Sequence, residues 1–318
     1  MLLEADQYIV GKPYRDSANL AAAAEVSVSS VKPLENLLQE QLRPLTESLA
    51  LSLPLRGKVS SISLYGTAKQ DTELTCHLFR ADKPENYNPA EKVCSLTVPV
   101  EATAETAPIN LMLDLDLTAG HYLLEVEENA DLALAMSKFS FTGAITSWLK
   151  HNTDPTHVDW ATGAMKDLEW VVTQGCLCFR VGCDEAMFGA ENLQNGFTRP
   201  YKGSNIWHSA EKKDQRIVLR WEKPQSISKI QLFFDSNLNR FCRSAETDYT
   251  DLFYRMVKDY TISYKAEDGS SRILYQVRDN FQRVNELNFD AVYTDEITVS
   301  LEDTHGQPFY SVYEIRCY

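Results

Sequence analysis

Three cysteines, Cys176, Cys178 and Cys183 in "CLCFRVGC", form the closest grouping of soft metal ligands in the sequence. Thiolates of this kind bind zinc when four ligands converge in a tetrahedron. On a strand, Cys176 and Cys178 point to the same face, but no second cysteine pair completes the set. Buried free thiols behave as small apolar side chains. We therefore interpret these cysteines as core residues and predict no metal site.

Carboxylates and histidines are present but are not spaced for catalysis. Asp248, Asp251 and Asp259 lie in "ETDYTDLFYRMVKD", whose spacing matches no calcium loop, so we interpret this stretch as a solvated loop. The sequence contains no G-x-G-x-x-G, G-x-x-x-x-G-K-[ST], H-E-x-x-H or G-x-S-x-G signature. The six histidines are scattered: His77, His121, His151, His157, His208 and His305. The sequence predicts no catalytic residue, no cofactor and no enzyme activity.

One polar loop carries the residue types of a ligand-binding site. The stretch "ENLQNGFTRPYKGSNIWHSAEKKDQRIVLRW", residues 191–221, combines Arg199, Tyr201 and Trp207 before it becomes an alternating pattern. Aromatic and cationic side chains of a loop can bind a ligand, or they can fix the loop to the core of its own domain. The residues alone leave both interpretations open.

Composition excludes several classes of partner. The chain of 318 residues is long enough for two domains. Its net charge of −14 argues against nucleic acids and anionic membranes, which attract basic surfaces. No apolar run approaches the ~20 residues that span a bilayer, and the first residues lack the features of a signal peptide. Seven cysteines indicate no disulfide framework, so a cytoplasmic location is the default expectation.

Alternation of apolar and polar residues dominates the chain. Segments such as "KVSSISLYG" (58–66), "INLMLDLDL" (109–117) and "ISKIQLFFD" (227–235) follow the two-residue period of half-buried strands. One stretch, 34–45, has a helical pattern, because Leu34, Leu37, Leu38, Leu42 and Leu45 fall on one face and Pro44 ends it. We predict an all-β protein of two β-sandwich (jelly-roll) domains with few short helices.

The second half of the chain resembles a discoidin-type module, also called the coagulation-factor C-type or galactose-binding-like domain. The resemblance rests on Asn192, Asn195-Gly196 and Trp207, then on "RIVLRWEKPQSISKIQLFFD", "VKDYTISYKAEDG" and the closing "VYEIRCY". It covers about 130 residues in the family's order. It implies a galactose-binding-like sandwich, a fold whose members bind sugars, lipids, collagen or proteins, so the fold does not fix the function.

The first strand of that family is found far from the rest of the module. It is similar to "NLAAAAEVSVSSV" (19–31), whereas no such strand immediately precedes Asn192. We therefore expect a tail over 1–16, a split galactose-binding-like domain over 17–31 plus 183–318, and an inserted β-sandwich over 32–182. The alternative is two domains in sequence. Pairing of Val26–Ser30 only with strands from 50–180 would contradict the insertion.

A second resemblance covers the whole chain. "LLEADQYIVG", "CFRV", "N..NG.TRP…N.W.S", "FD..LNR" and "YEIRCY" are similar to the C-terminal region of a bacterial FAD-dependent oxidoreductase family. The flavin domain of that family lies upstream, and its dinucleotide fingerprint is absent here. The resemblance therefore implies an accessory region next to a catalytic domain, and it brings no flavin chemistry to this chain.

The discoidin resemblance assigns structural roles to the polar loop. In the family an Asp-Gly pair belongs to a calcium site that a glutamate of the last strand completes. Here Asn195 replaces the acid and Glu314 matches the glutamate. We hypothesise that Arg199 takes the place of the cation and pairs with Glu314. Trp207 is expected in the core, with its indole N–H on a carbonyl.

A polar group near residue 235 and a set of loop residues are the remaining candidates for a functional role. Asp235, Asn239 and Arg240 in "FDSNLNRFCRS" form either a hydrogen-bonded corner at a strand end or a polar clamp at the mouth of the module. Ligands of this fold usually contact the loops at one end of the sandwich, where sugar rings stack on aromatic side chains. Candidate ligand-binding residues lie in such loops: Tyr201, Phe241, Arg243, Phe281 and Arg283.

The sequence thus predicts a non-catalytic carbohydrate-binding or substrate-recruiting accessory module. Its partners would be a carbohydrate and an upstream catalytic domain. The alternative is a structural or oligomerisation pair of domains that packs on a catalytic domain and binds no small molecule. A glycoside-active enzyme is disfavoured, although two carboxylates facing each other across a cleft are not visible in a sequence.

Overall fold

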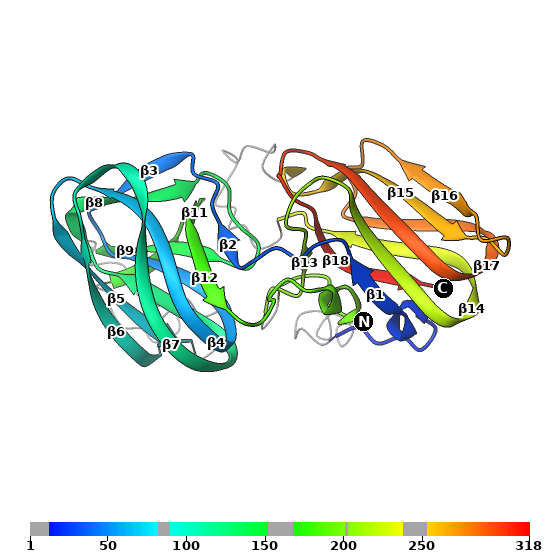
Figure 1. Ribbon diagram of the computed structural model, residues 1–318, viewed down its shortest axis with the longest axis horizontal. Coiled ribbons are helices and arrows are strands. Elements are labelled where there is room, and N and C mark those ends of the chain that lie inside the picture. Colours follow the sequence, from blue (N-terminus) through cyan, green and yellow to red (C-terminus); the bar gives the residue numbers. More distant parts are fainter. Residues whose placement is uncertain (1–12, 82–89, 152–167, 174, 201–202, 238–252) are drawn as a thin grey trace, which may run out of the picture. The chain divides into compact units, whose positions relative to one another are not determined.

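The computed structural model describes residues 13–81, 90–151, 168–173, 175–200, 203–237 and 253–318. These residues divide into two compact units. We call residues 13–33 together with 188–318 the discontinuous unit, and residues 34–187 the continuous unit. Antiparallel strands dominate both (Figure 1), which confirms the all-β class. The described residues include two short 3₁₀ helices, η1 (Leu20–Ala23) and η2 (Ala190–Gln194). No helix among the described residues is long and apolar enough to cross a membrane.

The discontinuous unit is one antiparallel sheet folded into two layers by bent strands. The strand order is β13-β18-β14-β17-β15-β16, with β1 added to β14. The register between β14 and β17 shifts between Arg220 and Gln225, so each long strand continues from one layer into the other. The strands are β1 (Glu25–Val28), β13 (Trp207–His208), β14 (Gln215–Phe234), β15 (Val257–Lys265), β16 (Ser271–Val277), β17 (Val284–Thr304) and β18 (Ser311–Cys317).

The core of this unit follows from the alternation of its strands. Ile217 and Leu219 of β14 are buried, whereas Arg216 and Arg220, which flank this pair, are exposed. Ile297, Val299 and Leu301 of β17 face the same core. Full burial of each such side chain contributes about 1.5–3 kcal/mol. The period of two therefore determines which face of each strand is covered.

The first segment of the chain is bonded to the last one at several points. β1 pairs with β14 from Glu25↔Arg220 to Val28↔Ile217. The indole N–H of Trp207 donates to the Ser30 carbonyl at 2.9 Å, and that of Trp221 to the Leu20 carbonyl at 2.8 Å. The predicted boundaries were 17–31 and 183–318, and the structure divides the chain at 33/34 and 187/188.

The Asn195-Gly196 turn brings the polar loop against residues 13–14. The Asn195 side chain accepts a hydrogen bond from the Phe197 N–H at 2.8 Å, which closes the turn. Gly196 has φ of +86°, and its carbonyl accepts a hydrogen bond from the Tyr14 N–H at 2.7 Å. A Cβ at Gly196 would lie 2.5 Å from the Tyr14 carbonyl oxygen. The glycine is needed for both the turn and the close approach.

The continuous unit is a second antiparallel sheet built around two long strands. β4 and β7 pair along most of their lengths, and the register shifts between Leu55 and Gly57 and between Val59 and Ser61. The order is β10-β9-β4-β7-β5-β6, with β2, β3, β8, β11 and β12 off this path. The strands are β2 (Glu35–Asn36), β3 (Gln41–Leu45), β4 (Leu49–Ala68), β5 (Thr72–Arg80), β6 (Glu91–Val100), β7 (Thr103–Val126), β8 (Asn129–Ser137), β9 (Ile145–His151), β10 (Leu168–Val172), β11 (Cys176–Leu177) and β12 (Phe179–Cys183).

The predicted helix over 34–45 is wrong. This stretch contains β2 and β3, and β3 pairs with β8 from Gln41↔Met136 to Pro44↔Ala133. Leu34 and Leu45 are buried, but the exposed fractions of Leu37, Leu38 and Leu42 are 42%, 36% and 42%. The leucine spacing fits a helix by coincidence, because pairing with β8 outweighs a weak helical preference.

The cysteine group lies inside the continuous unit. Cys176 and Cys178 are buried, and Cys183 is half-buried. Burial raises the pKa of the Cys178 thiol to about 12, so this side chain is protonated at neutral pH. Within the described part of the chain no three metal-ligating side chains converge. The buried thiols pack as small apolar groups.

Candidate functional site

Trp207 and Glu314 are both part of the interior of the discontinuous unit. Trp207 is fully buried, and its hydrogen bond to the Ser30 carbonyl confirms the predicted core role. Glu314 is also buried, but its carboxylate is bound by Arg316, with Nε–Oε1 at 2.9 Å and Nη2–Oε2 at 3.1 Å. The structure thus gives Arg316 as a partner of Glu314, and the Arg199–Glu314 pair stays a prediction. Residues 314 and 316 are two positions apart on β18, so their side chains share one face.

Arg316 is held by aromatic rings as well as by charge. Its guanidinium lies 3.8 Å from the centre of the Tyr14 ring and 4.5 Å from that of Phe233. Burial lowers the pKa of Arg316, but hydrogen bonds to Glu314 and its charge raise the pKa overall above the usual value. This cluster joins residue 14 to the last strand, so it stabilises the discontinuous unit.

Asp235 lies in a hydrogen-bonded corner at the end of β14, and Arg255 is one of its partners. Its carboxylate is completely buried and lies 3.3 Å from Nη1 of Arg255, whose side chain is 2% exposed. The other carboxylate oxygen accepts the Asn237 N–H at 2.8 Å. Asn239 and Arg240 lie outside the described residues. The buried ion pair fixes the end of β14 to the start of β15.

The candidate ligand-binding residues are described only in part. Tyr201, Phe241 and Arg243 lie outside the described residues. Phe281 is 50% exposed. Its ring lies 4.3 Å from that of His305 at an interplanar angle of 38°, and 5.2 Å from that of Phe253 at 84°. We call Phe253, Phe281 and His305 the aromatic trio.

Backbone hydrogen bonds position the aromatic trio from three separate loops. The His305 ring nitrogen Nε2 is 2.7 Å from the Asn280 carbonyl, and the His305 N–H donates to the Met256 carbonyl at 3.2 Å. Asn280 is buried and donates from its side chain to the Val257 carbonyl at 2.9 Å. The rings are therefore held in place, and Phe281 presents an aromatic surface at the loop end of the unit.

Arg283 lies close to this end and is mainly a loop anchor. Its Nη2 donates to the Thr198 carbonyl, and its own carbonyl accepts the Phe234 N–H at 2.8 Å. Burial lowers the pKa of Arg283, nearby Asp235 acts in the opposite sense, and Arg199 lowers the pKa further. Among the described residues its buried Nε has no hydrogen-bond partner. Arg283 therefore ties the polar loop to β14 and keeps one donor unused.

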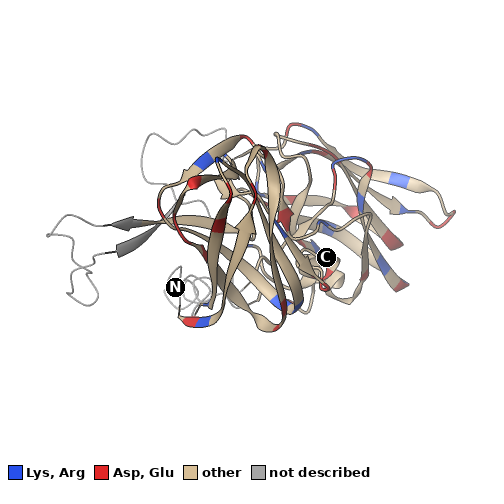
Figure 2. Cartoon of the chain, turned by 60° about the vertical axis from the view of Figure 1, so that its left-hand side comes forward, with Lys and Arg blue, Asp and Glu red and all other residues tan. Residues whose placement is uncertain are grey.

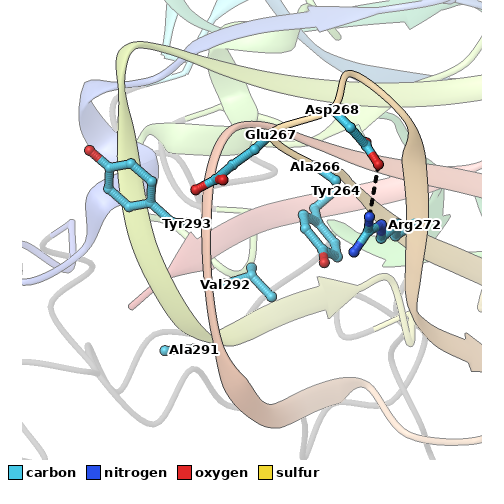
Figure 3. A pocket seen from close by; sticks show the side chains of 8 residues that line it. All are labelled: Tyr264, Ala266, Glu267, Asp268, Arg272, Ala291, Val292 and Tyr293. Atoms are coloured by element: carbon cyan, nitrogen blue, oxygen red, sulfur yellow. Dashed lines mark hydrogen bonds and ion pairs between the residues drawn. The ribbon is translucent and has the colours of Figure 1, made fainter.

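A hollow that the sequence did not reveal lies at the tip of the β15–β16 hairpin. It encloses about 390 Å³, and its lining side chains are drawn in Figure 3. They are Tyr264, Ala266, Glu267, Asp268, Arg272, Ala291, Val292 and Tyr293. The Asp268-Gly269 turn was visible in the sequence, but nothing there indicated that residues 291–293 of β17 lie beside it.

Comparisons with known proteins give similarities of structure only. No family model and no curated protein matches the chain. The family 32 carbohydrate-binding module of EndoD from Streptococcus pneumoniae is 19% identical, with a TM-score of 0.35, over 43% of this chain and 89% of that one. A chitosan-binding module of a chitosanase/glucanase from Paenibacillus sp. IK-5 is 19% identical, with a TM-score of 0.32, over 42% and 88%.

A third similar structure is the family 32 module of NanJ from Clostridium perfringens, solved in complex with galactose. It is 15% identical with a TM-score of 0.31, and the match covers 42% of this chain and 86% of that one. These identities and scores are too low to carry a function from one protein to the other. The function proposed below rests on this chain's own side chains.

Proposed function

We propose that the discontinuous unit is a non-catalytic saccharide-binding module and that the aromatic trio forms part of its contact surface. The half-exposed Phe281 carries this proposal, because its ring is large, apolar and held by two neighbouring rings. A pyranose ring has an apolar face that packs on an aromatic ring of this kind. A ring that is already fixed loses little conformational freedom when a ligand binds.

Replacement of Phe281 with alanine is expected to weaken saccharide binding about tenfold. Loss of an aromatic contact removes about 0.5–1.5 kcal/mol beyond the buried area. Calorimetric titration with galactose and N-acetylgalactosamine measures the effect, since these two uncharged sugars present different polar groups around similar ring faces. Because Phe281 is half-exposed, the melting temperature is expected to change little.

The matched control is Ile273→Ala on β16. Ile273 is 65% exposed and is not one of the three rings of the aromatic trio. It should leave the affinity unchanged. Equal affinities of the Phe281→Ala variant and the wild type would contradict a role for the trio, and silence of the full chain on a glycan array would contradict saccharide binding.

The accessory role extends this proposal to a larger protein. The resemblance to the C-terminal region of a flavin oxidoreductase family suggests that the module recruits a glycan substrate to an upstream catalytic domain. A structural role is the alternative, and the exposed Leu37, Leu38 and Leu42 of the continuous unit favour it, since such side chains can pack on another domain. A silent glycan array, together with self-association that is lost when the three leucines become serine, would support that alternative.

A further inference from the structure

The hollow at the hairpin tip has the volume of a small-molecule site, and its lining exposes more polar than apolar surface. Its walls come from the end of β15, the start of β16 and residues 291–293 of β17. Tyr264 and Val292 lie toward its centre in Figure 3, with Glu267 and Arg272 around them. A volume of about 390 Å³ is in the range of ligand pockets, which combine apolar walls with a few polar groups.

The walls of the hollow are fixed before any ligand arrives. The Asp268 carboxylate accepts hydrogen bonds from the N–H and the hydroxyl of Ser270, at 2.9 and 2.5 Å, and Gly269 takes φ of +78° to complete the turn. On the other side, the hydroxyl of buried Thr294 donates to the Lys265 carbonyl at 2.8 Å. Hairpin and β17 are thereby held together, and binding requires little reorganisation.

The charges around the hollow do not balance. Arg272 Nη2 lies 2.9 Å from the Asp268 carboxylate, so these two charges match each other. Hydrogen bonds from Ser270 and Arg272 lower the pKa of Asp268 to about 2, which keeps it ionised. Glu267, also in the lining, makes no ion pair or side-chain hydrogen bond with any described residue, although Lys and Arg occur at many positions along the described strands and loops (Figure 2). One negative charge is left for a ligand.

Two tyrosines add to the attraction for a cation. Tyr264 is half-buried in the lining, and Tyr293 is 58% exposed at its edge. The faces of aromatic rings attract ammonium groups. A carboxylate that accepts a hydrogen bond from an ammonium forms one of the stronger contacts in proteins. Tyrosine rings also pack against the apolar face of a sugar ring.

We propose that this hollow is a second binding site, which takes a ligand with an ammonium group next to an apolar ring face, namely an amino sugar. Glu267 binds the ammonium group, and Tyr264 and Tyr293 contact the ring. Arg272, held by Asp268, donates to the hydroxyls. The site lies at the far end of β15 from Phe253, so it is separate from the aromatic trio and does not depend on it.

The test compares two tetrasaccharides on the full chain. The glucosamine tetramer carries ammonium groups at pH 6, and the N-acetylglucosamine tetramer has the same rings without charge. Calorimetric titration is expected to show at least tenfold tighter binding of the charged tetramer at low salt, and a loss of most of this preference at about 1 M salt because of screening. Equal affinities for the two tetramers would overturn the proposal.

Substitutions in the lining test whether the charged tetramer binds in the hollow. Glu267→Gln and Tyr293→Ala are each expected to weaken binding of the charged tetramer about tenfold. Both side chains are exposed, so unchanged melting temperatures should show that the fold is intact. Glu222→Gln, at an exposed carboxylate of β14, is the control. If Glu267→Gln bound the charged tetramer with wild-type affinity, the proposal would be overturned. Phe281→Ala should bind the charged tetramer as tightly as the wild type does, because the proposed site is separate from the aromatic trio.

Discussion

Replacement of Arg255 with alanine is expected to lower the free energy of unfolding by about 3–5 kcal/mol, because it removes a buried guanidinium that lies 3.3 Å from the buried Asp235 carboxylate. Asp235 is completely buried and Arg255 is 2% exposed, so water cannot compensate either charge. For a protein of this size the melting temperature should fall on the order of 10 °C. Thermal and urea denaturation followed by circular dichroism measure the change.

An exposed ion pair provides the matched control. Arg220 lies 2.8 Å from Glu296 in a pair whose side chains are 54% and 26% exposed. Arg220→Ala should cost less than about 1 kcal/mol, since water screens such a pair. Removal of both buried charges in Asp235→Ala/Arg255→Ala should destabilise less than Arg255→Ala alone. If Arg255→Ala lowered the free energy of unfolding no more than Arg220→Ala does, the Asp235–Arg255 pair would not stabilise the end of β14 as predicted.

The all-β fold could be predicted because the alternation of apolar and polar residues recurs in many segments of the chain. In β14 the buried positions Ile217, Leu219, Ile230 and Leu232 keep the period of two within each half of the strand. The discoidin resemblance, rather than periodicity, led us to expect Trp207 in the core, where it is fully buried. Strand pairing across the chain does not appear in local patterns, and the stretch 34–45 shows the consequence, since β8 determines its conformation.

Candidate site residues were harder to predict than the fold. The predicted role of Glu314 did not include Arg316, which lies two residues away on the same strand and binds its carboxylate. Alternation on β18 indicates this pairing once the strand is known. The contacts of Phe281 with Phe253 and His305, and the hollow beside Asp268, join segments that are distant in sequence. Only the folded chain brings such residues together.

Residues 188–318 expressed alone are expected not to fold, whereas the same residues joined to 13–33 by a short Gly-Ser linker should unfold cooperatively. Without the first segment, β14 loses its partner β1, and the buried indole N–H groups of Trp207 and Trp221 lose their acceptors. Each buried donor left without a partner costs about 1–3 kcal/mol. Gln194 loses its bond to the Ala24 carbonyl, and the buried Ala21 leaves the core.

Together these losses approach the ~5–15 kcal/mol that stabilises a typical domain. A short linker is sufficient because both cut ends lie near His208. The Lys32 N–H donates to the His208 carbonyl at 2.8 Å, and the Phe188 ring is 4.5 Å from the His208 ring. Calorimetry and near-ultraviolet circular dichroism distinguish a folded from an unfolded product. A cooperative unfolding transition of residues 188–318 alone would contradict this prediction. It would mean that these residues form a complete domain and that residues 13–33 are not required for its folding.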